Sequence, residues 1–132
     1  MAVRVFVYGT LLSGLYNHYL LEGAEFIGNA VSCERGLMYS AGGFPILSFA
    51  SRADLIVGEI WQLPEGEAGD EMLENLDALE GYPGWYDRTL KDFRINGERI
   101  KALVYHQDSH MAMDIVKDGD WKAHLAKRQG AV

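Results

Sequence analysis

Glu80 lies at a position where the pattern of its helix calls for an apolar side chain. Leu73, Leu76 and Glu80 are spaced three and four residues apart, so they share the helix face that should contact the core. Glu80 also falls in the last turn, where the helix dipole disfavours a negative charge. Burial and the dipole both raise the pKa of a carboxyl group toward the range that suits a general acid or base. The alternative is structural: Glu80 reaches past Gly81 into water, or it pairs with Arg88.

A second candidate is the segment Tyr8-Gly9-Thr10-Leu11, which follows the apolar N-terminal run. A strand that ends at a glycine leaves successive backbone N–H groups unpaired, and these can converge on a carboxylate or a developing oxyanion. An ordinary strand-to-helix turn would explain the same four residues. The turn over residues 81–86, which contains three aromatic residues, follows Glu80 directly and is suited to form the wall of a small pocket.

Other chemistry-bearing residues are weaker candidates. His106 and His110 have a metal-binding spacing only when both lie on one helix, and here they follow a predicted strand, so we expect no metal site. Cys33 has no basic or histidine neighbour that would lower its pKa, and we expect a structural thiol. Because no phosphate-binding loop, dinucleotide-binding glycine motif or serine elbow occurs, we expect no cofactor.

Composition bounds the class of protein. The chain has 132 residues, of which 48% are hydrophobic and 23% charged, and this predicts a single folded domain over residues 1–132. The 19 acidic and 12 basic residues give a net charge of −7, which argues against a general binder of nucleic acids or anionic membranes. No apolar run approaches the ~20 residues that span a bilayer. The N-terminal run alternates like a strand rather than a signal peptide, so we expect a cytoplasmic protein.

The elements expected around these residues form an α+β domain. We expect strands over residues 2–8, 25–32, 35–40, 55–63, 87–95 and 100–106, with a hairpin turn at Asn96-Gly97. We expect helices over residues 13–22, 70–80 and 121–128, the second beginning at Asp70 as N-cap and ending at Gly81. The segment 42–45 predicts a turn. Because strands and helices do not alternate strictly, the pattern favours a curved sheet able to close on itself.

Four motifs, taken in order, resemble the γ-glutamylcyclotransferase-like family, and in particular its γ-glutamylamine cyclotransferase branch. They are Tyr8-Gly9-Thr10-Leu11, the run Leu-Asp-Ala-Leu-Glu-Gly-Tyr-Pro at 76–83, Tyr86-Asp87-Arg88 and Ala102-Leu103-Val104-Tyr105. The resemblance implies a small mixed β-barrel with flanking helices. It also implies a reaction without a cofactor, in which a γ-glutamyl compound cyclises to 5-oxoproline and releases an amine or amino acid.

The resemblance assigns roles to individual residues. Glu80 matches the general acid/base of the family, and Tyr8, Gly9, Thr10 and Leu11 match the loop that holds the γ-glutamyl group through backbone N–H groups. Gly43, Phe44 and Pro45 resemble a Gly-aromatic-Pro turn beside the pocket, with Phe where Tyr is common, so a hydroxyl is absent here. Tyr86 and Tyr105 match tyrosines at the pocket or its wall.

The implied partner is a small γ-glutamyl molecule, without nucleic acid or membrane, and the protein is expected to be a monomer or a homodimer. Two alternatives stay open. A protein of this fold can bind a small ligand in the same pocket without turning it over, although a pure binder gains little from a half-buried Glu80. Alternatively, the γ-glutamyl group is carried by a larger partner. The sequence does not identify the leaving group.

Overall fold

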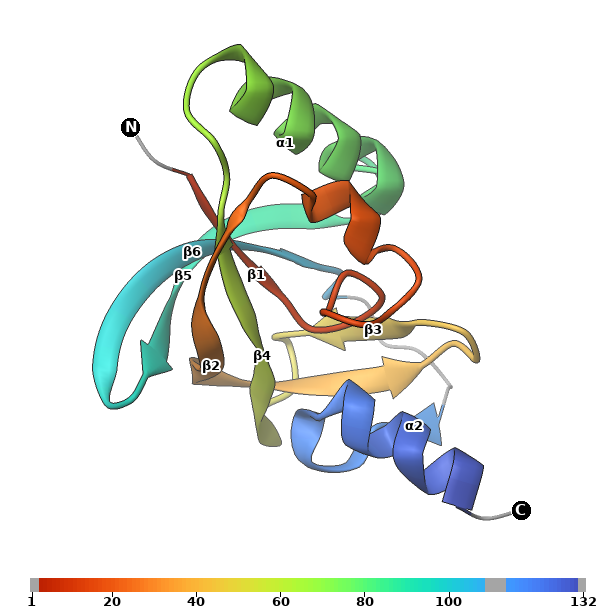
Figure 1. Ribbon diagram of the computed structural model, residues 1–132. Coiled ribbons are helices and arrows are strands. Elements are labelled where there is room, and N and C mark those ends of the chain that lie inside the picture. Colours follow the sequence, from red (N-terminus) through yellow and green to blue (C-terminus); the bar gives the residue numbers. More distant parts are fainter. Residues whose placement is uncertain (1–2, 109–113, 131–132) are drawn as a thin grey trace.

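The computed structural model describes residues 3–108 and 114–130, and its centre is a closed barrel of five strands (Figure 1). These strands are β1 (Arg4–Val7), β2 (Glu25–Ser40), β4 (Asp54–Gln62), β5 (Asp87–Ile95) and β6 (Glu98–His106). Their order is β2-β4-β1-β6-β5, and β5 pairs back with β2 to close the barrel. Because β1 and β6 are parallel and the other pairs antiparallel, the barrel is mixed, which confirms the predicted fold class.

β1 lies between two strands from distant parts of the chain. Its residues Val5, Phe6 and Val7 are all buried, as expected for a strand that is covered on both faces. The Phe6 ring stacks on Phe93 of β5 with the ring centroids 4.1 Å apart, so this pair fills the barrel interior. Gly58 of β4 allows β1 and β4 to lie close together, because a Cβ atom at this position would lie 2.2 Å from the Val7 carbonyl oxygen.

β2 is one continuous strand, so the prediction of separate strands over 25–32 and 35–40 is wrong. The strand bends at register shifts between Phe26 and Gly28 and between Val31 and Arg35 instead of ending. At the second shift the Ser32 hydroxyl accepts the Ile56 N–H at 2.8 Å and donates to the Glu34 carbonyl at 2.7 Å, which replaces lost ladder bonds.

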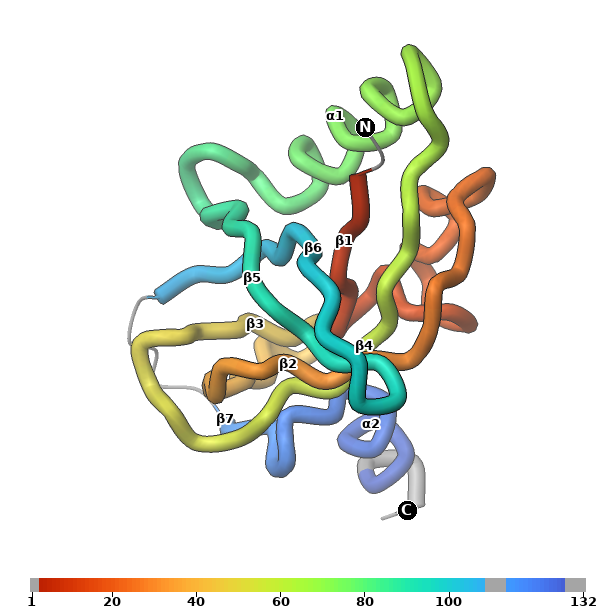
Figure 2. The backbone as a smooth tube through the Cα atoms, turned by 90° about the vertical axis from the view of Figure 1, so that its left-hand side faces the viewer, coloured from red at the N-terminus to blue at the C-terminus, as the bar shows by residue number. Residues whose placement is uncertain are grey.

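Beyond this bend, β2 pairs with β4 again at Arg35 and Gly36. Its last residues then pair with two short strands, β3 (Pro45–Ser48) and β7 (Asp114–Ile115), which lie beside it in Figure 2. β3 was not predicted. It follows the expected turn directly, because Pro45 already pairs with Ser40.

The helix α1 (Glu67–Glu80) begins earlier than predicted and ends where predicted. Gly66 is its N-cap, and the Asp70 N–H already donates to the Gly66 carbonyl at 3.1 Å, so the assignment of Asp70 as N-cap is wrong. Gly81 adopts the left-handed conformation with φ 69° and ends the helix, as expected of a C-cap glycine.

The remaining segments agree in part with the predictions. The segment 13–22 is a series of turns that contains only the short 3-10 helix η1 (His18–Leu21), so the predicted helix there is wrong. Gly14 has φ 84°, a backbone conformation that a right-handed helix excludes. The hairpin turn is confirmed, with φ 50° at Asn96 and 85° at Gly97.

A C-terminal unit covers the end of the barrel opposite α1 (Figure 1). It consists of the 3-10 helix η2 (Lys117–Gly119) and α2 (Trp121–Gly130), and α2 confirms the helix predicted over 121–128. The Trp121 side chain is completely buried and fixes this unit to the core. Over the described residues, no helix combines the length and apolar character that crossing a membrane requires.

Candidate active site

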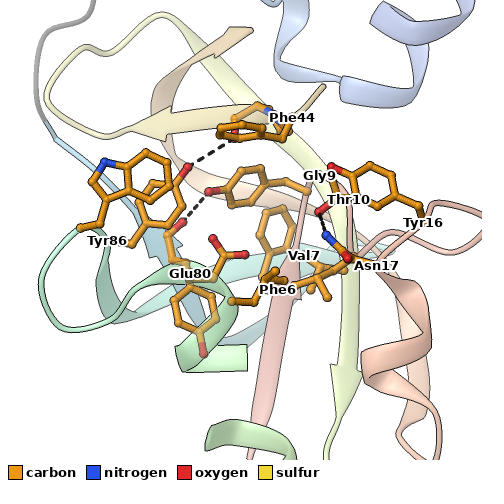
Figure 3. A pocket seen from close by; sticks show the side chains of 15 residues that line it. Phe6, Val7, Gly9, Thr10, Tyr16, Asn17, Phe44, Glu80 and Tyr86 are labelled. Atoms are coloured by element: carbon orange, nitrogen blue, oxygen red, sulfur yellow. Dashed lines mark hydrogen bonds between the residues drawn. The ribbon is translucent and has the colours of Figure 1, made fainter. Parts of the chain in front are cut away.

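A cavity of about 210 Å³ lies where the end of β1, the end of α1 and the aromatic turn after α1 meet (Figure 3). Every predicted site residue except Gly43 lines it. The lining residues are Phe6, Val7, Tyr8, Gly9, Thr10, Leu11, Tyr16, Asn17, Phe44, Pro45, Leu79, Glu80, Trp85, Tyr86 and Tyr105. Gly43 precedes Phe44 in the adjoining turn, and its carbonyl accepts a hydrogen bond from the Tyr16 hydroxyl at 3.4 Å.

Glu80 is the last residue of α1, and its carboxyl group points into this cavity (Figure 3). Leu76, one turn earlier, is completely buried, so the helix period brings Glu80 toward the core as the sequence indicated. Burial raises the pKa of Glu80 from 4.5 to about 7. Among the described residues nothing hydrogen-bonds or ion-pairs with this carboxyl group; Arg88 instead lies 2.5 Å from Asp77. The pairing of Glu80 with Arg88 left open by the sequence does not form.

Three tyrosines form the wall around Glu80, and each uses its hydroxyl group within the protein. Tyr8 donates to the Tyr105 carbonyl at 2.7 Å, and Tyr86 donates to the Pro45 carbonyl at 3.4 Å. The Tyr105 hydroxyl donates to Asp77 at 2.6 Å. Burial raises the pKa of all three tyrosines, so their hydroxyl groups are neutral at physiological pH. Because the described lining contains no other carboxyl group and no Lys, Arg or His, Glu80 is the group there that titrates near neutrality.

The loop after β1 is held by its carbonyl groups and leaves its N–H groups unused. The carbonyls of Gly9, Thr10 and Leu11 contact donors from residues 12, 17 and 18 at 2.8–3.0 Å. The N–H groups of the same three residues have no acceptor among the described residues. Gly9 and Leu11 are buried, and buried N–H groups are normally paired. The loop therefore offers unpaired donors at the cavity wall, where a carboxylate or an oxyanion would satisfy them.

The position of Gly9 requires a glycine, because the turn that carries Phe44 packs directly against it. A Cβ atom at Gly9 would lie 2.6 Å from Cγ and 2.8 Å from Cδ of Pro45, and the proline ring cannot move aside like a flexible side chain. The absence of a side chain at Gly9 therefore lets the buried Pro45 pack on the loop, which places Phe44 over the cavity (Figure 3).

The model of the family described as gamma-glutamyl cyclotransferase, AIG2-like matches residues 5–123 of this chain. The chain belongs to this family. It is 32% identical to gamma-glutamylaminecyclotransferase A of Danio rerio, over 92% of this chain and 74% of that protein. It is 30% identical to the gamma-L-glutamyl-butirosin B gamma-glutamyl cyclotransferase of Niallia circulans, over 98% and 81% of the two chains. The crystal structure of an AIG2-like protein from Mus musculus has the same fold, with a TM-score of 0.71, 23% identity and coverage of 90% and 88%.

Sequence reasoning missed two carboxylates that support the cavity in this member of the gamma-glutamyl cyclotransferase, AIG2-like family. Glu59 of β4 is buried and accepts hydrogen bonds from the Ser13 N–H at 2.9 Å, the Ser13 hydroxyl at 2.6 Å and the Trp61 indole at 3.1 Å. Burial alone would raise the pKa of Glu59, but these hydrogen bonds lower it overall. A carboxyl group between Gly58 and Ile60, in the middle of a predicted strand, was the signal that could have identified it.

Asp77 is the second missed carboxylate, and it joins α1 to two strands. It accepts the Tyr105 hydroxyl of β6 and pairs with Arg88 of β5, whose guanidinium group also lies 4.5 Å from the centre of the Tyr82 ring. Burial alone would lower the pKa of Arg88, but its hydrogen bond to the Asp77 carboxyl group and the charge of that group raise it overall. Arg88 thus pairs with Asp77 of α1 and not with Glu80.

The expected lack of a metal site rested on His106 and His110, and His110 lies outside the described residues. His106 is buried, with Nδ1 2.9 Å from Asp108 and Nε2 2.7 Å from Thr89. In the described part of the chain, no three His, Cys, Asp or Glu side chains are grouped as metal ligands. Cys33 is a half-buried free thiol on β2.

Proposed function

We propose that the protein is a γ-glutamyl cyclotransferase that releases 5-oxoproline and an amine from a γ-glutamyl amine or peptide. The observation that carries this proposal is the position of Glu80. It is an unpartnered carboxyl group with a pKa of about 7, and it shares one cavity with the unpaired N–H groups of the loop after β1. Family membership and the names of the relatives described above support the same activity.

The substrate supplies its own nucleophile in this reaction. Its α-amine attacks the γ-carbonyl carbon, so a new C–N bond closes a five-membered ring and the C–N bond to the leaving amine breaks. Binding the chain in a folded conformation provides the advantage of an intramolecular reaction without a covalent enzyme intermediate. No water is consumed, and the step needs no cofactor.

Glu80 moves the proton that this exchange requires. In its ionised form it accepts a proton from the attacking amine, and it then returns that proton to the departing nitrogen. A carboxyl group with a pKa near the working pH can do both, because it is neither too weak a base nor too weak an acid.

The loop after β1 binds the negative oxygens of the substrate. Because no cationic side chain lines the cavity among the described residues, the N–H groups of Gly9, Thr10 and Leu11 are the donors available for this charge. They can hold the α-carboxylate of the glutamyl group or the oxygen that becomes negative during attack. We propose that this machinery acts on small molecules and belongs to one domain formed by residues 1–132.

The proposal is tested by mass-spectrometric detection of 5-oxoproline. The purified protein and the Glu80→Gln variant are incubated with γ-glutamyl amines, γ-glutamyl dipeptides and glutathione. We expect 5-oxoproline from the unmodified protein and a rate at least about a hundredfold lower from the variant, because an amide cannot transfer the proton. Equal rates would contradict the role of Glu80. Saturable, stoichiometric binding of these compounds without product would support the alternative of a non-catalytic binding protein.

A further inference from the structure

We infer that the amine released by this protein carries an uncharged aromatic or bulky apolar group, which Phe44, Leu79 and Trp85 receive. This inference rests on the proposed function, because it concerns the leaving-group side of the same cavity. It assigns a substrate preference to Leu79 and Trp85, to which neither the motif resemblance nor the chemistry of Glu80 gives a role. It assigns the same preference to Phe44, which the resemblance places only beside the pocket.

The position of Glu80 determines where the leaving group lies. Since Glu80 returns a proton to the departing nitrogen, that nitrogen must come within hydrogen-bond distance of its carboxyl group. Figure 3 shows Glu80 on the side of the cavity near Tyr86, with Gly9 and Thr10 on the other side. A glutamyl group held at the loop therefore directs its leaving amine toward the side chains that surround Glu80.

Those surroundings are apolar and partly open to water. Leu79 precedes Glu80 and is 40% exposed, and Trp85 is 48% exposed. The Trp85 ring stacks on the Tyr86 ring with their centroids 4.7 Å apart. The Phe44 ring meets the Trp85 ring edge to face with their centroids 6.2 Å apart. Phe44, Leu79 and Trp85, here called the apolar rim, line the same cavity as Glu80. A ring seated on this rim would remove apolar surface from water and stack on aromatic side chains.

The charges of the cavity exclude the main competing class of leaving group. A γ-glutamyl amino acid would bring a second carboxylate beside Glu80, which is partly ionised near neutral pH. No Lys, Arg or His among the described lining residues could compensate that charge, and the whole chain has a net charge of −7. The carboxylate of Glu80 would attract a cationic leaving group, but the charged end of that group would lie over Phe44, Leu79 and Trp85, which are all uncharged. The cation is therefore tested directly as a competing class.

Four synthetic substrates separate these possibilities. γ-Glutamyl-phenethylamide carries a neutral ring, γ-glutamyl-phenylalanine carries the same ring with a carboxylate, γ-glutamyl-ethylamide has no ring, and γ-glutamyl-cadaverine carries a cation. We expect kcat/KM for the phenethylamide to exceed that for each of the other three by about tenfold or more, the gain typical of burying an apolar group of this size. The assay is release of 5-oxoproline by the full chain.

The variant Trp85→Ala links the preference to the apolar rim. We expect it to lower the ratio of kcat/KM for phenethylamide over ethylamide severalfold toward one, with its folding checked by thermal unfolding. The control is Leu90→Ala, which removes a leucine that is 57% exposed on β5 outside the cavity lining and should keep the ratio of the unmodified protein.

The outcomes distinguish the inference from the proposed function. Product from several substrates with no preference for the phenethylamide would overturn the inference alone. A higher kcat/KM for the phenylalanine or cadaverine compound, or an unchanged ratio in folded Trp85→Ala, would also overturn it. No product from any of the four would contradict the proposed function and the inference together.

Discussion

The Tyr8 hydroxyl donates a 2.7 Å hydrogen bond to the backbone carbonyl of Tyr105, and this bond joins the ends of two parallel strands. The Tyr105 hydroxyl in turn donates to Asp77 of α1 at 2.6 Å. Asp77 lies one helical turn before Glu80 on the chain, so the two bonds connect the loop after β1, through β6, to the helix that carries Glu80. This connection fixes the distance between the unpaired N–H groups and the carboxyl group.

The Tyr105→Phe variant tests this connection. We expect it to lower the free energy of unfolding by about 1–2 kcal/mol, because it removes a hydrogen bond to a charged acceptor. The measurement is urea denaturation. Tyr16→Phe is the control, since Tyr16 is 66% exposed and its hydroxyl makes only a 3.4 Å hydrogen bond. Equal stability of the Tyr105→Phe variant and the unmodified protein would show that the bond does not hold α1.

The rate should depend on pH through the ionisation of Glu80. Burial raises the pKa of Glu80 to about 7, and in the proposed mechanism the ionised form accepts the proton of the attacking amine. We therefore expect kcat/KM to rise with pH through an apparent pKa of about 7. Steady-state rates measured from about pH 5 to about pH 9 would show this, and a profile with no inflection near neutrality would argue against Glu80 as the base.

The same shift in pKa makes the stability of the protein depend on pH. Because the pKa of Glu80 rises from 4.5 to about 7 on folding, the folded protein binds more protons than the unfolded chain between these values, and stability falls as the pH rises through them. Glu80→Gln removes this cost. We expect the variant to be more stable than the unmodified protein by about 2 kcal/mol at about pH 8 and nearly equal at about pH 4. Denaturant unfolding at both pH values measures the difference in stability between the variant and the unmodified protein. An equal difference at the two pH values would contradict the prediction.

A side chain at Gly9 should damage binding. The Gly9→Val variant places its Cβ within 2.6 Å of Pro45, so the loop or the turn must move. We expect kcat/KM on the order of a hundredfold lower, because displacement of binding groups by about 1 Å has effects of this size. Gly84→Ala is the matched control, since the nearest atom to a Cβ there is at 3.5 Å. Unchanged kinetics in Gly9→Val would show that the loop does not bind substrate as proposed.

Glu59 should stabilise the segment that follows the Gly9–Leu11 loop, because it accepts hydrogen bonds from Ser13. Glu59→Ala leaves the two Ser13 donors and the Trp61 indole without their acceptor, and we expect a loss of about 2–3 kcal/mol in the free energy of unfolding. The loss should be smaller at acid pH, because the pKa of Glu59 is lowered on folding and its contribution disappears as the carboxyl group protonates. The exposed Glu65→Ala serves as control in the same unfolding experiments.

The sequence predicted those features that depend on local geometry. Glu80 was identifiable because a helical period of 3.6 residues places it in line with Leu76, and the hairpin at Asn96 because Asn-Gly favours the positive φ values found there. The barrel followed from the motif resemblance, which also named some of the residues that line the cavity. Gly66 and Asp70 are both acceptable N-caps by type, and only the structure decides between them, because the Asp70 N–H already donates to the Gly66 carbonyl.

What the sequence could not predict depends on contacts between distant segments. At the bend of β2 the Ser32 hydroxyl accepts a hydrogen bond from Ile56 of another strand, and no pattern within 25–40 reveals that partner. The structural role of Glu59 depends on its hydrogen bond with Ser13, which is far away in the chain. The residue that requires glycine at position 9 is Pro45, likewise distant, so the reason for Gly9 became visible only in three dimensions.

The position of β1 between β4 and β6 has a consequence for synthesis of the chain on the ribosome. β1 pairs with Gln62 through Arg4 and with Leu103 through Val5, so both of its neighbours are made much later than β1 itself. A nascent chain therefore carries the Tyr-Gly-Thr-Leu segment long before it can hold that segment in place. We expect chains that stop before β6 to lack the cavity and to depend on chaperones, although they already contain both Gly9 and Glu80.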